Sequence, residues 1–160
     1  MPHPTPQVIL PGQGPIALGP DMSRSVLKLV SPQTNALLSL TEYHAPPAGG
    51  PPLHMHTLED ETFYILEGEV TFYVGGNIIK ATPGTTVFAP RHTPHTFKNC
   101  ITQWAKFIMV VTPPDNFERF YARISAKHAN GSDPTPDEVI ARIGQFAPEH
   151  GLQIMGPNPL

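Results

Sequence analysis

The sequence predicts an all-β domain followed by two helices, and three observations support this prediction. Short apolar runs rich in Val, Ile, Thr, Phe and Tyr begin about every 8–12 residues between positions 24 and 111, which is the spacing of strands in a sandwich or barrel. The chain contains 21 prolines but only 14% charged residues, a balance that favours turn-rich β structure over a helical bundle. After Pro113-Pro114 the apolar residues recur with helical spacing.

At 160 residues the chain has the size of one domain, which we divide into three segments. Residues 1–22 are rich in Pro and Gly and are expected to form an extended or partly disordered arm. Residues 23–112 are predicted to form a β-barrel, and residues 113–160 a helical extension of the same domain. The predicted strands are 24–31, 35–44, 52–57, 61–67, 69–75, 77–81, 85–90, 94–99 and 102–111.

The two predicted helices differ in the signals that mark them. One apolar face is expected for the first helix, formed by Phe117, Phe120, Tyr121, Ile124 and His128. The second begins at a capping-box sequence over residues 135–138, with Pro at its first turn. Such one-sided helices need an apolar partner, so we expect both to pack outside the barrel or against a second subunit.

Composition argues against several classes of partner. The net charge is −3 and the sequence has no basic cluster, so we expect no nucleic-acid binding. No stretch approaches the roughly 18 apolar residues of a membrane span, so we expect no membrane insertion. The single cysteine, Cys100, cannot form an intramolecular disulfide, and the first residues lack the pattern of a signal peptide. A cytoplasmic location is therefore expected.

Candidate metal ligands cluster in the middle of the chain. His54 and His56 are two residues apart and would lie on one face of a strand. A carboxylate from the following segment could join them after a bend, and Glu61, Glu59 and Asp60 are all candidates. With His95 the set becomes three imidazoles and one carboxylate, which suits iron, manganese, nickel, cobalt or zinc.

Two segments around these residues resemble the signature motifs of the cupin superfamily. Residues 50–68 contain His-x-His, then four residues, a Glu, six residues and a Gly. Residues 84–99 contain a Gly six positions before a Pro, followed by a His and, four positions later, an Asn. The matching residues are His54, His56, Glu61, Gly68, Gly84, Pro90, His95 and Asn99. Residues 25–160 also resemble small single-domain cupins described as quercetin-dioxygenase-like.

The resemblance implies a double-stranded β-helix, or jelly-roll, barrel that holds one divalent transition metal per chain. The implied ligands are His54, His56, Glu61 and His95, and the alternative is a metal-free cupin with a solvated loop here. Glu61 is also implied as a catalytic base. Ala48 and His92 occupy positions where the motifs usually have glycine. We interpret His92 either as a loop residue at the barrel mouth or as a catalytic acid/base, a gating residue or a fifth ligand.

The resemblance further implies an oxygenase that acts on a small, partly aromatic or enolisable molecule. A redox-neutral isomerase, cyclase or lyase is the first alternative, and a non-catalytic small-molecule-binding protein is the second. Small cupins commonly pair, so we expect a homodimer in which residues 1–22 contribute the arm. Strand aromatics are expected to line the pocket or fill the core: Phe63, Tyr64, Phe72, Tyr73, Phe88, Phe97, Trp104 and Phe107.

Overall fold

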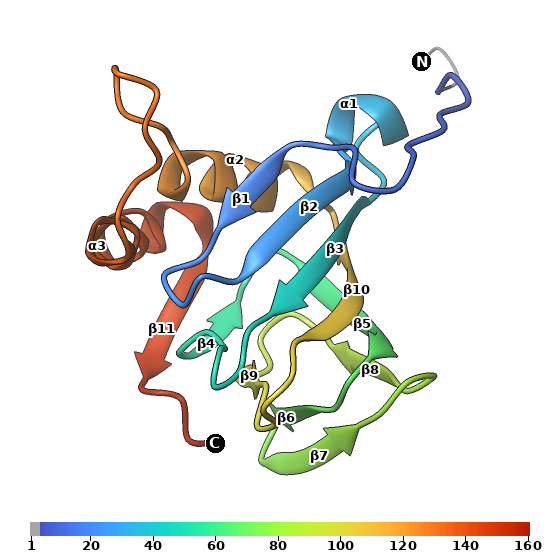
Figure 1. The fold of residues 1–160 in the computed structure, drawn as a ribbon, viewed down its shortest axis with the longest axis vertical. Helices are drawn as coiled ribbons and strands as arrows, with labels where there is room; N and C mark the ends of the chain where they lie inside the picture. The colour runs from blue at the N-terminus through green and yellow to red at the C-terminus, as the bar shows by residue number, and fades with distance from the viewer. Residues whose placement is uncertain (1–3) are drawn as a thin grey trace.

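The computed structural model describes residues 4–160 and consists of two antiparallel β-sheets packed around a shared core (Figure 1). The larger sheet has the strand order β1–β2–β3–β10–β5–β8. Its strands are β1 (Ile16–Leu18), β2 (Arg24–Leu29), β3 (Ser39–Ala45), β5 (Asp60–Glu67), β8 (Thr86–Ala89) and β10 (Ala105–Thr112). The strand order alternates between distant parts of the sequence, as in a jelly roll.

The smaller sheet has the order β11–β4–β9–β6–β7. Its strands are β4 (Leu53–His56), β6 (Val70–Val74), β7 (Asn77–Ala81), β9 (His95–Lys98) and β11 (Leu152–Gly156). A turn at residues 75–76 joins β6 to β7, with both glycines at positive φ. The predicted jelly-roll fold is therefore confirmed.

The core lies between the two sheets and is dominated by aromatic rings. Alternation along β3, β5 and β10 directs every second side chain inward. The stacked pair of Tyr43 and Phe107, with ring centroids 4.8 Å apart, lies against rings from both sheets. These further rings are Phe63, Phe72 and Phe97. This apolar centre fixes the strands that carry the site described below.

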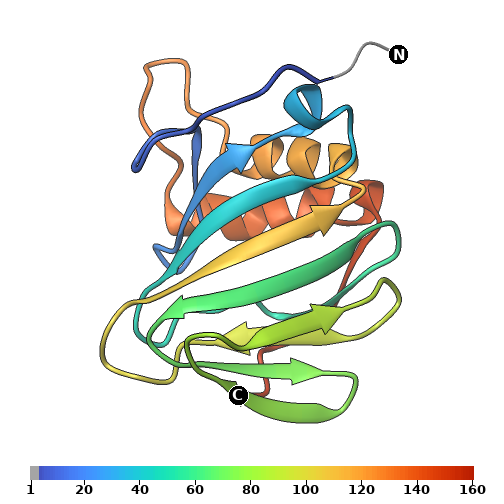
Figure 2. The same cartoon turned by 90° about the vertical axis from the view of Figure 1, so that its right-hand side faces the viewer.

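Two helices, α2 (Asp115–Ile124) and α3 (Pro136–Phe146), lie outside the sheets at one end, whereas the β6–β7 hairpin lies at the other (Figures 1 and 2). Helix α2 contributes Phe117 to the core between the sheets. Helix α3 packs on α2 in a second apolar cluster. Its capping box is present, since Thr135 and Glu138 exchange hydrogen bonds. Both predicted helices are therefore confirmed, although α2 ends before His128.

Four further elements of residues 4–160, namely β1, a short helix, a 3-10 turn and β11, were not predicted. Within the expected arm, Ile16–Leu18 forms the edge strand β1 by pairing with β2. Residues 31–34 form a short helix, α1 (Ser31–Thr34), with Pro32 in its first turn, so β2 ends at Leu29. After the 3-10 turn η1 (Pro148–His150), β11 pairs with β4. Of these elements, β11 pairs with a strand about a hundred residues earlier in the sequence.

Within residues 4–160, none of the helices combines the length and apolar character needed to cross a membrane.

Candidate metal centre

The three predicted imidazoles meet because two neighbouring strands carry them. His54 and His56 lie two positions apart on β4 and are both buried. His95 begins β9 and is the direct cross-strand partner of His54, with their ring centroids 4.5 Å apart. Residues directly opposite each other on antiparallel strands share a face of the sheet. The strand register therefore places all three rings on the inner face of the smaller sheet.

The carboxylate comes from the opposite sheet. Glu61 lies on β5, after a bend at residues 57–59 that reverses the chain between the sheets. Its Oε2 atom is 2.8 Å from Nε2 of His95 and 3.6 Å from Nε2 of His56. Candidate ligand atoms of the three histidines and Glu61 all lie within 4.8 Å of one another, and all four residues are buried. One ion with bond lengths of about 2.0–2.2 Å could contact all four atoms.

Each imidazole is oriented by a hydrogen bond on the side away from this centre. The Nδ1–H groups of His54 and His95 each donate to the carbonyl oxygen two residues earlier, over 2.8 Å. A carbonyl can only accept, so Nδ1 carries the proton and the Nε2 lone pair is free to bind a metal. His56 Nδ1 lies 3.2 Å from Oε2 of Glu59 instead. The donor set and its outer hydrogen bonds fit a divalent metal.

The two alternative carboxylates are committed elsewhere. Glu59, only 1% exposed, contacts the outer nitrogen of His56 and accepts a hydrogen bond from Asn116 Nδ2 at 2.7 Å. Asp60 forms a two-pronged ion pair with Arg91, at 3.1 and 2.8 Å. Glu61 is therefore the carboxylate of this segment that faces the three Nε2 atoms.

Burial and neighbouring charges shift the pKa values of three of the candidate ligands. Burial lowers the pKa of His54 to about 3, and the rings of His95 and His56 act in the same direction. Burial alone would raise the pKa of Glu61, but His56 and His95 outweigh it and bring that pKa to about 2. Burial is likewise outweighed at His56, whose pKa is raised by Glu61 and Glu59. Neutral His54 and anionic Glu61 are the protonation states of metal ligands.

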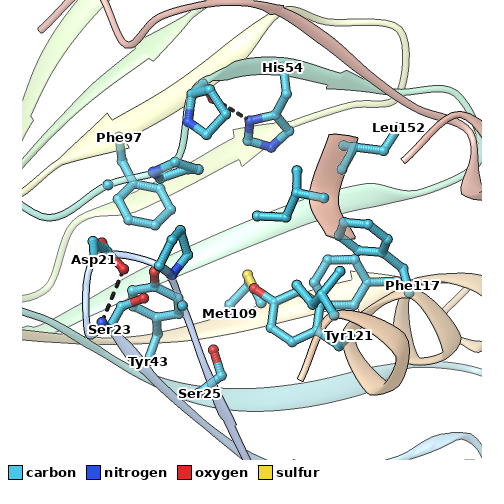
Figure 3. A pocket seen from close by; sticks show the side chains of 18 of the residues that line it. Asp21, Ser23, Ser25, Tyr43, His54, Phe97, Met109, Phe117, Tyr121 and Leu152 are labelled. Atoms are coloured by element: carbon cyan, nitrogen blue, oxygen red, sulfur yellow. Dashed lines mark hydrogen bonds between the residues drawn. The ribbon is translucent and has the colours of Figure 1, made fainter. Parts of the chain in front are cut away.

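The centre opens into a cavity of about 100 Å³ between the sheets and the helices (Figure 3). His54, His56 and Glu61 line one side of it. Its apolar walls come from both sheets and from α2 and α3, including Phe97, Met109, Phe117, Phe120, Tyr121, Ile124, Ile143 and Leu152. An apolar cavity beside a cluster of ligating groups is the usual setting of a small-molecule site.

The strand aromatics, expected in the pocket or the core, divide between the cavity, the core and the surface. Phe97 lines the cavity, whereas Phe63, Phe72 and Phe107 belong to the core. Tyr64, Phe88 and Trp104 are exposed. Tyr43 also lines the cavity, which was not predicted, although it occupies a buried position in the alternating pattern of β3. Phe117 and Tyr121 were predicted only to pack on the apolar face of a helix. The helical spacing of these residues predicted that they are buried, but it did not predict that a cavity lies beside them.

His92 is exposed and does not line the cavity. Its backbone N–H donates to the carbonyl of His56 over 2.7 Å, so its loop still touches the ligand strand. His92 and Ala48 have φ angles of 64° and 61°. This left-handed backbone explains why glycine is usual at both motif positions.

Comparison with known proteins agrees with this geometry. The sequence profile described as "Cupin domain" matches residues 41–111, which contain all four clustered residues. Together with the jelly-roll fold and the buried His and Glu side chains, this match shows that residues 41–111 are similar to the cupin domain.

Individual relatives are more distant. Quercetin 2,3-dioxygenase from Bacillus subtilis (strain 168) is 28% identical over 106 residues, which cover 65% of this chain but only 31% of that protein. The polyketide cyclase RemF from Streptomyces resistomycificus is similar in structure, with a TM-score of 0.58 at 24% identity, over 67% of this chain and 79% of that one. A predicted oxalate decarboxylase from Thermotoga maritima gives 0.61 at 19% identity, over 66% and 98%. The two structures support the fold alone.

Proposed function

We propose that His54, His56, Glu61 and His95 hold one divalent transition metal per chain. The observation that carries this proposal is the convergence of their ligand atoms within 4.8 Å in a buried site. Iron, manganese, nickel, cobalt and zinc all suit three imidazoles and one carboxylate. With four protein ligands, a five- or six-coordinate ion keeps at least one position for a substrate, which distinguishes catalytic from structural sites.

The reaction that this site supports best is oxygenation of a small, partly aromatic or enolisable molecule with O₂ as the co-substrate. A bound divalent metal would act as a Lewis acid toward a substrate oxygen. The similarity to quercetin 2,3-dioxygenase over 106 residues motivates the choice of oxygenase. The apolar walls would exclude water and hold a planar ligand.

Within this proposal Glu61 has a second role as the base. Its buried carboxylate stays anionic at neutral pH, because its pKa lies at about 2. Oε2 lies 2.8 Å from Nε2 of His95, so in the proposed complex the same carboxylate would both hold the ion and receive the substrate proton. His92 remains a candidate gating or acid/base residue on the loop that contacts β4.

Metal analysis of purified wild-type protein and variants tests the ligand assignment. We expect one equivalent of metal in wild type and none in His56→Ala or His95→Ala, whereas the control His44→Ala, outside the cluster, keeps it. Glu61→Ala should lose metal, and Glu59→Ala should keep most of it. If Glu59→Ala empties the site and Glu61→Ala does not, the ligand assignment is wrong.

Oxygen uptake by the metal-loaded protein tests the reaction. Flavonols, diketones and phenolic acids are the substrates to screen, and we expect O₂ consumption in proportion to product. Product formation at full rate without O₂ would favour an isomerase, cyclase or lyase, and unchanged ligand would indicate a binding protein. Glu61→Gln at wild-type rate would exclude the base role. His92→Ala should change substrate affinity more than metal content if His92 gates the mouth.

The homodimer and the cytoplasmic location also remain predictions. Light scattering at micromolar concentration would test the dimer, and removal of residues 1–22 should weaken it. Residues 1–3 of that arm lie outside the described residues.

A further inference from the structure

The cavity has a second polar region, on the side away from His54 (Figure 3). Ser25 on β2 and Tyr43 on β3 are direct cross-strand partners, so their side chains share one face. Asp21 joins them from the turn between β1 and β2, and Tyr121 from α2. Four segments thus bring a carboxylate and hydroxyl groups to one end of an otherwise apolar space.

Asp21 is held firmly but is only half satisfied. Its Oδ1 atom accepts a hydrogen bond from the backbone N–H of Ser23 at 3.0 Å. Its Oδ2 atom is buried and, among residues 4–160, has no hydrogen-bond partner. Gly49 packs against this oxygen, since a Cβ there would lie 2.7 Å away. A buried carboxylate oxygen without a donor is costly, and a ligand donor that reached Oδ2 would remove this cost.

The neighbouring phenols remain protonated. Burial raises the pKa of Tyr43 and of Tyr121, and the Asp21 carboxylate acts in the same direction at both. Ser23 forms a hydrogen bond with Tyr43, and Ser25 with Tyr121. These side chains therefore add neutral hydroxyl groups to the same end of the cavity as the Asp21 carboxyl group.

The size of the cavity limits the ligand. Its volume of about 100 Å³ is below that of the roughly 150 Å³ apolar cavity that binds benzene, so at most one ring fits without movement, and the larger flavonols of the oxygen-uptake screen would require the cavity to open. The metal ligands lie on one side and Asp21 on another, so a single ring could touch both.

We propose that Asp21, assisted by Tyr43 and Tyr121, is a specificity-determining residue that binds a hydrogen-bond donor on a single-ring substrate. The donor is a hydroxyl or an ammonium group on the part of the substrate that points away from the metal. The proposal deepens the proposed function, because it names the substrate class of that same cavity. It also predicts a binding preference that does not require the metal.

The experiment measures dissociation constants for phenol, benzylamine and toluene by NMR titration of the metal-free and zinc-loaded full-length protein. The variants are Asp21→Asn and Tyr121→Phe, with Asp115→Asn as a control because Asp115 is exposed on α2 and outside the cavity. In wild type and the control, we expect phenol or benzylamine to bind at least ten-fold more tightly than toluene. Asp21→Asn should remove this preference, and Tyr121→Phe should reduce it several-fold.

The outcomes separate the two proposals. Preference for phenol identifies a hydroxyl donor, and preference for benzylamine identifies an ammonium. Equal binding of toluene, or an unchanged preference in Asp21→Asn, overturns the role of Asp21, and Tyr121→Phe gives the same test if Asp21→Asn does not fold. Failure of wild type to bind zinc refutes the metal site instead, while the donor preference of the metal-free protein still decides the role of Asp21.

Discussion

Asn116 is the residue whose removal should show most clearly how α2 and η1 support the metal centre. Its Nδ2 group donates to Glu59 Oε1 at 2.7 Å and to the carbonyl of His150 at 2.6 Å, and its Oδ1 atom lies 3.0 Å from His150 Nδ1. Glu59 in turn holds the outer nitrogen of His56. The Asn116→Ala variant loses all three contacts and leaves the buried Glu59 carboxylate short of a donor.

The expected effect is large for a single polar side chain. Three hydrogen bonds at about 1 kcal/mol each give a loss of roughly 3 kcal/mol in the free energy of unfolding. If the metal binds as proposed, zinc affinity should also fall about ten-fold, because the group that orients a metal-ligating histidine has moved.

Urea unfolding of the metal-free protein measures the first effect, and competition with a chromogenic zinc chelator measures the second. Asn77→Ala is the matched control, since Asn77 is exposed and makes only a 3.5 Å contact with a carbonyl oxygen. The expected loss is refuted if the free energy of unfolding of Asn116→Ala lies within about 0.5 kcal/mol of the wild-type value, which is the usual scatter for surface substitutions. A stability loss with unchanged zinc affinity would refute the link to His56 alone.

Other predictions concern backbone positions and pH. Gly144→Ala in α3 should stabilise the protein by about 0.5–1 kcal/mol in urea unfolding, because its Cβ would meet no atom within 4 Å. Gly50→Ala should instead destabilise it by more than about 2 kcal/mol, since the new Cβ would lie 2.1 Å from a backbone oxygen; equal effects would contradict this. His92→Gly should raise the melting temperature by relieving its left-handed backbone, a gain of about 1 kcal/mol. Zinc affinity, measured by chelator competition, should fall with decreasing pH. The raised pKa of His56 means that its proton competes with the metal from above pH 6.5 downward; affinity independent of pH between 5 and 8 would contradict this.

The ligand cluster could be predicted from the sequence because its residues lie at fixed spacings within two short segments. The spacing of His54 and His56 fixes their common face, and motif spacing selected Glu61 over Glu59, whose outer role then appeared in the structure. Ala48 and His92, two of the non-glycine residues with positive φ, were also visible as departures from glycine. Most strands of both sheets were predicted for the same reason, because the alternation of buried and exposed residues can be read from neighbouring positions.

The far side of the cavity was not predictable in this way. Asp21 lies in a turn that was placed in the N-terminal arm, and it reaches the cavity only because β1 pairs with β2. Tyr121 shows the periodicity of any packed helix, which does not reveal that an empty space lies beside it. Strand β11 had the weak signal of alternating Leu152 and Ile154 after a glycine, but its partner lies about a hundred residues away.

That distance has a consequence for how the protein is made. Strand β4, which carries two of the imidazoles, pairs with β11 through Leu152 opposite His56 and Ile154 opposite His54. At a synthesis rate of about 5–20 residues per second, β4 leaves the ribosome roughly 5–20 seconds before β11 exists. During this interval one edge of β4 is unpaired, and its histidines are open to stray metal ions and to other nascent chains. The pairing of this edge of β4 thus waits until β11 has been synthesised.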